Sequence, residues 1–358
     1  MNQKEKKLFF RLCAFQKPNE RKIRALLESN CATYEVLGVL FANRMAGVAY
    51  SVLKELKLLD LVDREFRNSL RSAALLNEKM NEDYFGCVRF LTSELDACGV
   101  PYALLKGAFL CHWYPRGCRT SNDIDVLIAP EDVGKVTEKL KMAGFRQGYL
   151  KNGEFIPANR QQIIESKMMR GETVPFIKEV KKPFMKYLEV DLNFSLDYKN
   201  SDETTLKAML ERTEVVTVGA ARIKTLSHYD FLLHLCAHLY KEATTIPWIR
   251  MKRDMTFYKY CDIYGLLHEY SKKQMDELLG VAKARGLERE LVYCLYSIKK
   301  FFGVGSLKCG KHICDPHHWN LDEVIAPSEK KIYRYKESDP RKRFFVKERM
   351  KLLREVSE

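Results

Sequence analysis

The sequence predicts an α+β protein in which a mixed sheet is flanked by helical regions on its N-terminal and C-terminal sides. Apolar residues recur at helical spacing up to Gly99, short strand-like runs then alternate with short helices, and helical spacing returns at Leu226. We therefore expect an N-terminal helical region (1–98), an α/β core (99–225) and a C-terminal helical domain with a basic tail (226–358).

The N-terminal region is predicted to be helical throughout. The segment KIRALLESN ends near Asn30, and apolar residues from Tyr34 to Leu61 recur at helical spacing. A long helix then starts near Phe66 and ends at Gly99, because glycine readily adopts the positive φ that closes helices.

The core is predicted to contain three strands separated by two helices. VPYALLKG, DIDVLIAP and KYLEVDLNFSL have the apolar patterns of strands. Between them, AFLCHWYP is expected to form a short helix ending at Pro115, and EDVGKVTEKLKMAGF a helix closing at Gly144. The basic stretch 151–186, which precedes the third strand, yields no predicted element.

The C-terminal region is again predicted to be helical. Ser227 is a candidate N-cap for HYDFLLHLCAHLYKEA, with Asp230 in the acidic position of a capping box. Two further helical stretches follow, PWIRMKRDMTFYKYCDIYGLLHEY and MDELLGVAKARGLERELVYCLYSIKKFFG.

The composition excludes several classes of protein. With 46% hydrophobic and 30% charged residues, the chain is neither disordered nor collagen-like. No stretch reaches the roughly 18 uncharged apolar residues of a membrane-spanning helix, so no membrane contact is expected. The first residues lack a signal-peptide pattern, so the 11 cysteines are expected to be reduced thiols in a cytoplasmic protein.

The formal net charge of +14 leaves two interpretations open. It can favour solubility, or it can attract a polyanion such as a nucleoside triphosphate or RNA. Lysine and arginine are dense in residues 329–358, with tyrosine and phenylalanine between them, a mixture that suits RNA contact. An amphipathic helix on the protein's own surface is the favoured interpretation of this tail.

Two aspartates on the second predicted strand are the most informative feature. Asp123 and Asp125 would project from one face of the strand, while Ile124 and Val126 face a core. Neighbouring acids repel unless a cation compensates, and magnesium prefers such hard oxygen ligands. If the third strand lies beside the second, Asp191 completes a three-carboxylate cluster, which can hold two metal ions.

A lysine and a glycine end the first predicted strand just before a helix. Gly107 would let a phosphate approach the backbone, and Lys106 could neutralise its charge. Each motif alone is weak, because D-I-D is common at solvated strand ends and Lys-Gly at turns. Their order is more specific: strand, glycine, helix, strand with D-x-D, helix, and strand with a further aspartate.

That order resembles the nucleotidyltransferase fold of the DNA polymerase β superfamily. More closely, LLKGAFLCHWYPRGCRTSNDIDVLI is similar to the core motif of nucleotidyltransferase family 5, a largely uncharacterised bacterial family. The similarity also includes FANRMAGVAYSVL, EVDLNFSL, SHYDFLLHLCAHLYKE and the segment from Trp248 to Leu267. It covers roughly residues 35–270 and leaves 271–358 outside.

The resemblance implies a polymerase β-like mixed sheet and a metal-dependent enzyme that uses two Mg²⁺ ions. The implied reaction moves a nucleoside monophosphate from an NTP, with ATP expected, to a hydroxyl acceptor and releases pyrophosphate. The matching positions are Asp123, Asp125 and Asp191 for catalysis and metal binding, and Lys106, Gly107 and Arg119 for nucleotide binding.

Two positions depart from the family pattern. Ala108 stands where many polymerase β relatives have serine, and Asn193 where family 5 often has histidine. Three functions stay open: transfer to a small molecule, which is favoured, nucleotidylation of tRNA or protein as in toxin-like relatives, and a non-catalytic nucleotide- or RNA-binding module.

Candidates in the C-terminal half have mostly structural interpretations. His238 matches a family histidine, and Asp254 or Asp262 could support an acceptor site, although packing is favoured for each. His234 and His238 are one helical turn apart, but HLCAH lacks the glutamate of zinc proteases. Zinc-ligand residue types at a spacing that matches no common finger occur at Cys309, His312, Cys314 and His317.

Overall fold

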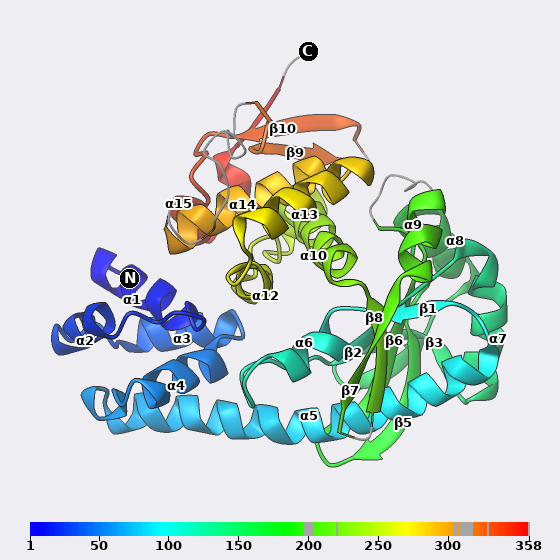
Figure 1. Ribbon diagram of the computed structural model, residues 1–358, viewed down its shortest axis with the longest axis horizontal. Helices are drawn as coiled ribbons and strands as arrows, with labels where there is room; N and C mark the ends of the chain where they lie inside the picture. Colours follow the sequence, from blue (N-terminus) through cyan, green and yellow to red (C-terminus); the bar gives the residue numbers. More distant parts are fainter. Residues whose placement is uncertain (197–202, 220, 304–306, 308–317, 328, 357–358) are drawn as a thin grey trace. The chain divides into compact units, whose positions relative to one another are not determined.

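The computed structural model describes residues 1–358 except 197–202, 220, 304–306, 308–317, 328 and 357–358 (Figure 1). The chain divides into two compact units. We call Ser69–Phe231 the sheet unit, and Met1–Asn68 together with Leu232–Glu358 the helical unit.

The sheet unit contains, within the described residues, an eight-stranded mixed sheet with the order β4-β3-β5-β6-β2-β1-β8-β7. Its strands are β1 (Tyr102–Leu104), β2 (Asp123–Ile128), β3 (Arg146–Lys151), β4 (Glu154–Pro157), β5 (Phe176–Lys182), β6 (Met185–Asn193), β7 (Thr213–Val218) and β8 (Ala221–Leu226). β2 is antiparallel to β1 and parallel to β6, and β1 is parallel to β8. The expected mixed sheet and its three predicted strands are therefore present.

One face of this sheet packs on helices. The helices of this part of the chain are α5 (Arg64–Cys98), α6 (Gly107–Trp113), η2 (Pro130–Asp132), α7 (Val133–Met142), α8 (Arg160–Arg170) and α9 (Glu203–Glu211). Ile124, Val126 and Ile128 of β2 are fully buried in a core shared with α5 and α7. The alternation predicted for β2 is thus confirmed, and the opposite face of the strand is left for its aspartates.

Five strands of this sheet have no counterpart in the sequence prediction. β3, β4, α8 and β5 lie in or beside the basic stretch 151–186, and β7 and β8 form a hairpin. β4 and β7 are the two edges of the sheet and are largely solvated. Edge strands can be solvated on both faces, so the sequences of β4 and β7 lack the one-sided apolar alternation on which the prediction depends.

The helical unit joins the two ends of the chain. Its helices are α1 (Gln3–Cys13), α2 (Glu20–Glu28), α3 (Tyr34–Ala42), α4 (Ala46–Glu55), η1 (Leu59–Leu61), α10 (His228–Ala243), α11 (Ile246–Arg250), α12 (Phe257–Leu267), α13 (Lys272–Ala284), α14 (Glu288–Phe302), α15 (Pro340–Phe344) and η5 (Arg349–Leu352). Phe9 of α1 packs on Phe257 of α12 and stacks on Phe344 of α15, with ring centroids 5.1 and 5.3 Å apart. The first 68 residues therefore group with the C-terminal half instead of forming a region of their own.

The basic tail is folded differently from the favoured prediction. Instead of one amphipathic helix it contains β10 (Lys331–Tyr335) and β11 (Leu353–Glu355), which form an antiparallel sheet with β9 (Glu323–Ala326). The amphipathic-helix prediction was wrong, because only the short α15 and η5 are helical between these strands.

Among the described residues no single helix is both long and apolar enough to cross a membrane. α3 and α4 pass that test only together, and they are bent by 120° relative to each other.

Candidate active site

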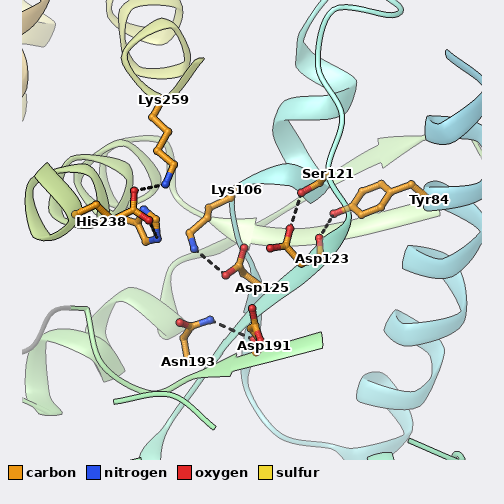
Figure 2. Close-up of polar contacts among 10 residues, drawn as sticks. Tyr84, Lys106, Ser121, Asp123, Asp125, Asp191, Asn193, His238 and Lys259 are labelled. Atoms are coloured by element: carbon orange, nitrogen blue, oxygen red, sulfur yellow. Dashed lines mark hydrogen bonds and ion pairs between the residues drawn. The ribbon is translucent and has the colours of Figure 1, made fainter. Parts of the chain in front are cut away.

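The acidic residues singled out in the sequence come together on adjacent strands. In the parallel pairing of β2 with β6, Asp125 lies opposite Asp191 and Asp123 lies opposite Glu189. Residues paired in register point to the same face, and neighbouring strands are about 4.8 Å apart. Because Ile124 faces the helix-covered core, these four carboxylates share the other face of the sheet. Figure 2 shows three of them, Asp123, Asp125 and Asp191, gathered at this point.

Lys106 brings a positive charge to the acidic cluster. It directly follows β1 and Leu105, and its Nζ lies 2.7 Å from Oδ1 of Asp125 (Figure 2). Both side chains are largely buried, with exposed fractions of 19% and 7%. Its backbone has φ 45° and ψ −108°, a conformation that non-glycine residues rarely adopt. Such strain is found where the surrounding structure holds a functional residue in place.

Gly107 is required by the protein's own packing. A Cβ atom at this position would lie 2.4 Å from Cβ and Oγ of Ser121 and 3.2 Å from the hydroxyl of Tyr84. The sequence prediction explained this glycine by the approach of a phosphate. The structure supplies a different reason, since the first turn of α6 passes directly against the loop that leads into β2.

Helix α5 fixes that loop through three polar side chains. Asn77 donates to the carbonyl oxygen of Gly117 and Asn81 to that of Arg119, both at 2.8 Å. The Tyr84 hydroxyl donates to the carbonyl oxygen of Asp123 at 3.1 Å. Sequence reasoning missed these residues, although their spacing of four and three positions marks one helical face.

Ser121 was also missed by the sequence analysis. Its hydroxyl donates to Oδ1 of Asp123 at 2.8 Å. Burial opposes the charged form of Asp123, but Lys106 and this hydrogen bond lower the pKa of its carboxyl below the usual value. Asp123 is therefore held as a carboxylate.

The rest of the cluster carries more negative charge than its surroundings neutralise. Burial, and then the charges of Asp125 and Asp123, raise the pKa of Asp191 well above its usual value. Burial and the same two aspartates raise the pKa of Glu189. Like charges held close together behave in this way until a cation compensates them.

The carboxylate oxygens of this cluster are ligands of the kind that magnesium prefers. They are hard donors, and the Lys106 ammonium shows that a cation is accepted on Asp125. As the side chains stand, no group of three His, Cys, Asp or Glu residues in the described part of the chain is arranged around one metal position. Metal binding would therefore require the carboxylates to change rotamer.

The structure also shows the contacts of three other residues considered in the sequence analysis. Arg119 is buried, and its guanidinium donates to the carbonyl oxygen of Thr120. Ala108 is fully buried in the apolar core of the sheet unit, where its methyl group packs. The Asn193 amide donates to the carbonyl oxygen of Asp191 at 3.2 Å, so it lies beside the cluster.

The three acceptor-site candidates all lie in the helical unit. Asp254 is fully buried, and both of its carboxylate oxygens accept from the Arg349 guanidinium, at 2.6 and 2.5 Å. His238 lies 3.7 Å from the buried Glu242, while Asp262 is buried in α12. These contacts support the structural interpretation of Asp254.

The zinc hypotheses receive no support from the described residues. His234 and His238 are neighbours on α10, with ring centroids 6.3 Å apart, but they belong to no group of three metal-binding side chains. Cys309, His312, Cys314 and His317 lie outside the residues that the structure describes.

Comparison with known proteins identifies a matching family and a similar solved structure. Comparison with curated proteins finds no match. A crystal structure of an antigenic nucleotidyltransferase-like protein from Paracoccidioides brasiliensis is similar at 16% identity with a TM-score of 0.32, over 56% of this chain and 88% of that one. The profile of a family described as uncharacterised nucleotidyltransferases matches residues 33–303, well over half of the sequence. The chain therefore belongs to this nucleotidyltransferase family.

Proposed function

We propose that the protein has a polymerase β-like core and transfers a nucleoside monophosphate from an NTP, with ATP expected, to a hydroxyl acceptor. The observation that carries this proposal is the register of β2 with β6, which sets Asp125 beside Asp191 with Asp123 on the same face. The chain belongs to a family of nucleotidyltransferases. Its three adjacent carboxylates and the neighbouring Lys106 are groups that phosphoryl-group chemistry needs.

The metal ligands in this proposal are Asp123, Asp125 and Asp191, with two Mg²⁺ ions expected. When bound, divalent cations would neutralise phosphate charge and make the acceptor oxygen a better nucleophile. Lys106 and Arg119 supply the chain's own positive charge near the phosphates, and the seven-residue α6 adds little to it.

The reaction balances with these residues. Asp191, beside the nucleophile, accepts the proton of the acceptor hydroxyl as its oxygen attacks the α-phosphorus. An oxygen–phosphorus bond forms, the bond from the α-phosphorus to the bridging oxygen breaks, and pyrophosphate leaves with that electron pair. The bonds from Asn81 and Tyr84 hold the loop and the start of β2 still during this exchange.

A small molecule is the favoured acceptor, and tRNA or protein is the alternative. The net charge of +14 supports a polyanionic acceptor or nucleotide. The tail gives RNA less support than its sequence suggested, because Phe344 is buried against Phe9 and Arg349 pairs with Asp254. Stacking on bases requires exposed aromatic rings.

Labelled nucleotides test the reaction. ATP carrying label at the α-phosphorus, incubated with the protein, Mg²⁺ and cell extract, should transfer that label to an acceptor. Label from the γ-phosphorus should appear only in pyrophosphate. Asp125→Asn should lower the transfer by at least about 100-fold, since it removes a carboxylate ligand of the metal ions that neutralise the reacting phosphate.

The matched control is Asp132→Asn, an aspartate of the same sheet unit outside the cluster, which should transfer label as the wild type does. Transfer of γ-label to an acceptor would mean a phosphotransferase. Nucleotide binding without any transfer would instead support the non-catalytic module.

A further inference from the structure

One carboxylate of the acidic cluster is already paired with a lysine. Nζ of Lys106 lies 2.7 Å from Oδ1 of Asp125, and Asp125 lies opposite Asp191 in the pairing of β2 with β6. The ammonium group thus contacts one of the carboxylates that the proposed function assigns to metal ions. Two cations on one carboxylate oxygen repel each other strongly in a partly buried site.

We propose that Lys106 is an exchangeable counter-ion that competes with divalent metal for Asp125 and is released to the nucleotide phosphates when metal binds. This inference rests on the proposed function and adds a specific order of events to it. It makes Lys106 a residue that couples metal binding to nucleotide binding.

The release of Lys106 from Asp125 would be a movement of its side chain and not of its backbone. Lys106 itself has φ 45°, its carbonyl oxygen accepts from the amide of Leu110 at 2.9 Å, and Gly107 lies so close to Ser121 that a Cβ would not fit between them. The main chain is therefore fixed, whereas the four-carbon stem can turn the ammonium group from Asp125 to another anion.

The charge balance favours exchange over simple addition. One ammonium is set against four carboxylates, because Asp191 lies opposite Asp125 and Glu189 lies opposite Asp123 on adjacent strands. A divalent ion compensates this charge better than a monovalent one, but it must displace the lysine. A nucleotide that accepts the displaced ammonium removes part of that cost, so metal and nucleotide should tighten each other's binding.

Metal binding by the nucleotide-free protein tests the proposal without any measurement of activity. The free Mn²⁺ signal in electron paramagnetic resonance reports the bound fraction for the full-length wild type, Lys106→Gln and Lys106→Arg. Lys106→Gln should bind Mn²⁺ about tenfold more tightly than the wild type, because the competing charge is gone. Lys106→Arg keeps the charge and should bind as weakly as the wild type.

A non-hydrolysable ATP analogue provides the second readout. It should tighten Mn²⁺ binding to the wild type and do so much less for Lys106→Gln. The matched control is Lys141→Gln, which removes a half-exposed lysine that is 2.8 Å from Glu138 on α7 and should change neither value. Thermal unfolding of each variant checks that it is folded.

Three results would overturn the inference. If Lys106→Gln binds Mn²⁺ no more tightly than the wild type, or if Lys106→Arg gains affinity equally, Lys106 does not compete with metal, and the transfer of α-label still stands. If the wild type binds no Mn²⁺ with or without the ATP analogue, the proposed function itself fails and the inference with it.

Discussion

At the scale of single residues, the site depends on close contacts around Gly107 and Lys106. Gly107 passes Ser121 at a distance that excludes a Cβ atom. Lys106, immediately before it, is held at positive φ beside Asp125. Together these contacts set where the lysine side chain starts, and therefore which carboxylate it reaches.

Gly107→Ala should destabilise the protein by about 1–3 kcal/mol, because the added methyl group overpacks the contact with Ser121. Chemical denaturation measures the loss. Ser121→Gly removes the colliding atoms, so the double variant should recover part of the stability of Gly107→Ala. Simple additivity of the two single changes would show that the collision is not the cause.

Asp191→Asn should stabilise the metal-free protein by about 0.5–2 kcal/mol. It removes a buried negative charge from beside Asp125, where burial and like charges already raise the pKa of Asp191. Denaturant unfolding in the presence of a chelator checks this, with the exposed Glu165→Gln as control. A loss of stability would mean that the carboxylates do not repel each other in the folded protein.

At the scale of elements, α5 connects the apolar core to the start of β2. Its apolar residues pack beneath the sheet, and Asn77, Asn81 and Tyr84 hold the carbonyl groups of the motif loop. One helix thus provides both the packing and the positioning, which explains why these polar residues occur on a largely buried face.

Tyr84→Phe keeps the ring and deletes one hydrogen bond, so it should cost about 0.5–1.5 kcal/mol of stability. Because the lost bond holds the start of β2, kcat for nucleotidyl transfer should fall while KM for the nucleotide changes little. Tyr149→Phe, on β3 away from the cluster, is the control. Unchanged stability and kcat would show that the bond contributes nothing.

At the scale of the whole molecule, the helical unit is discontinuous in sequence. Phe9 and Phe10 of α1 lie among Phe257, Phe301 and Phe344, which come from three later helices. The first helix is therefore part of the core of the C-terminal half, and neither segment buries its aromatic rings alone.

Phe9→Ala should destabilise the helical unit by about 3–5 kcal/mol, since it leaves a cavity where a fully buried ring packed. The exposed Tyr34→Ala is the matched control and should have little effect. Thermal unfolding followed by circular dichroism compares them. Equal effects of the two changes would argue against a shared aromatic core.

The sequence by itself determined the local features of this protein. Periodicity identified the helices, the alternation of apolar residues in DIDVLI identified a strand with two aspartates on its free face, and motif order identified the family. These features follow from neighbours in the chain, where spacing translates directly into a shared face.

Only the tertiary structure decided which distant segments of the chain contact each other. The register of β6 on β2 brings Asp191 beside Asp125, and α5 reaches the motif loop about forty positions along the chain. The edge strands and the tail sheet, which lack a one-sided apolar pattern, were also decided there. The reason is physical: strand pairing and packing contacts depend on which surfaces meet, and periodicity within a segment does not encode its partner.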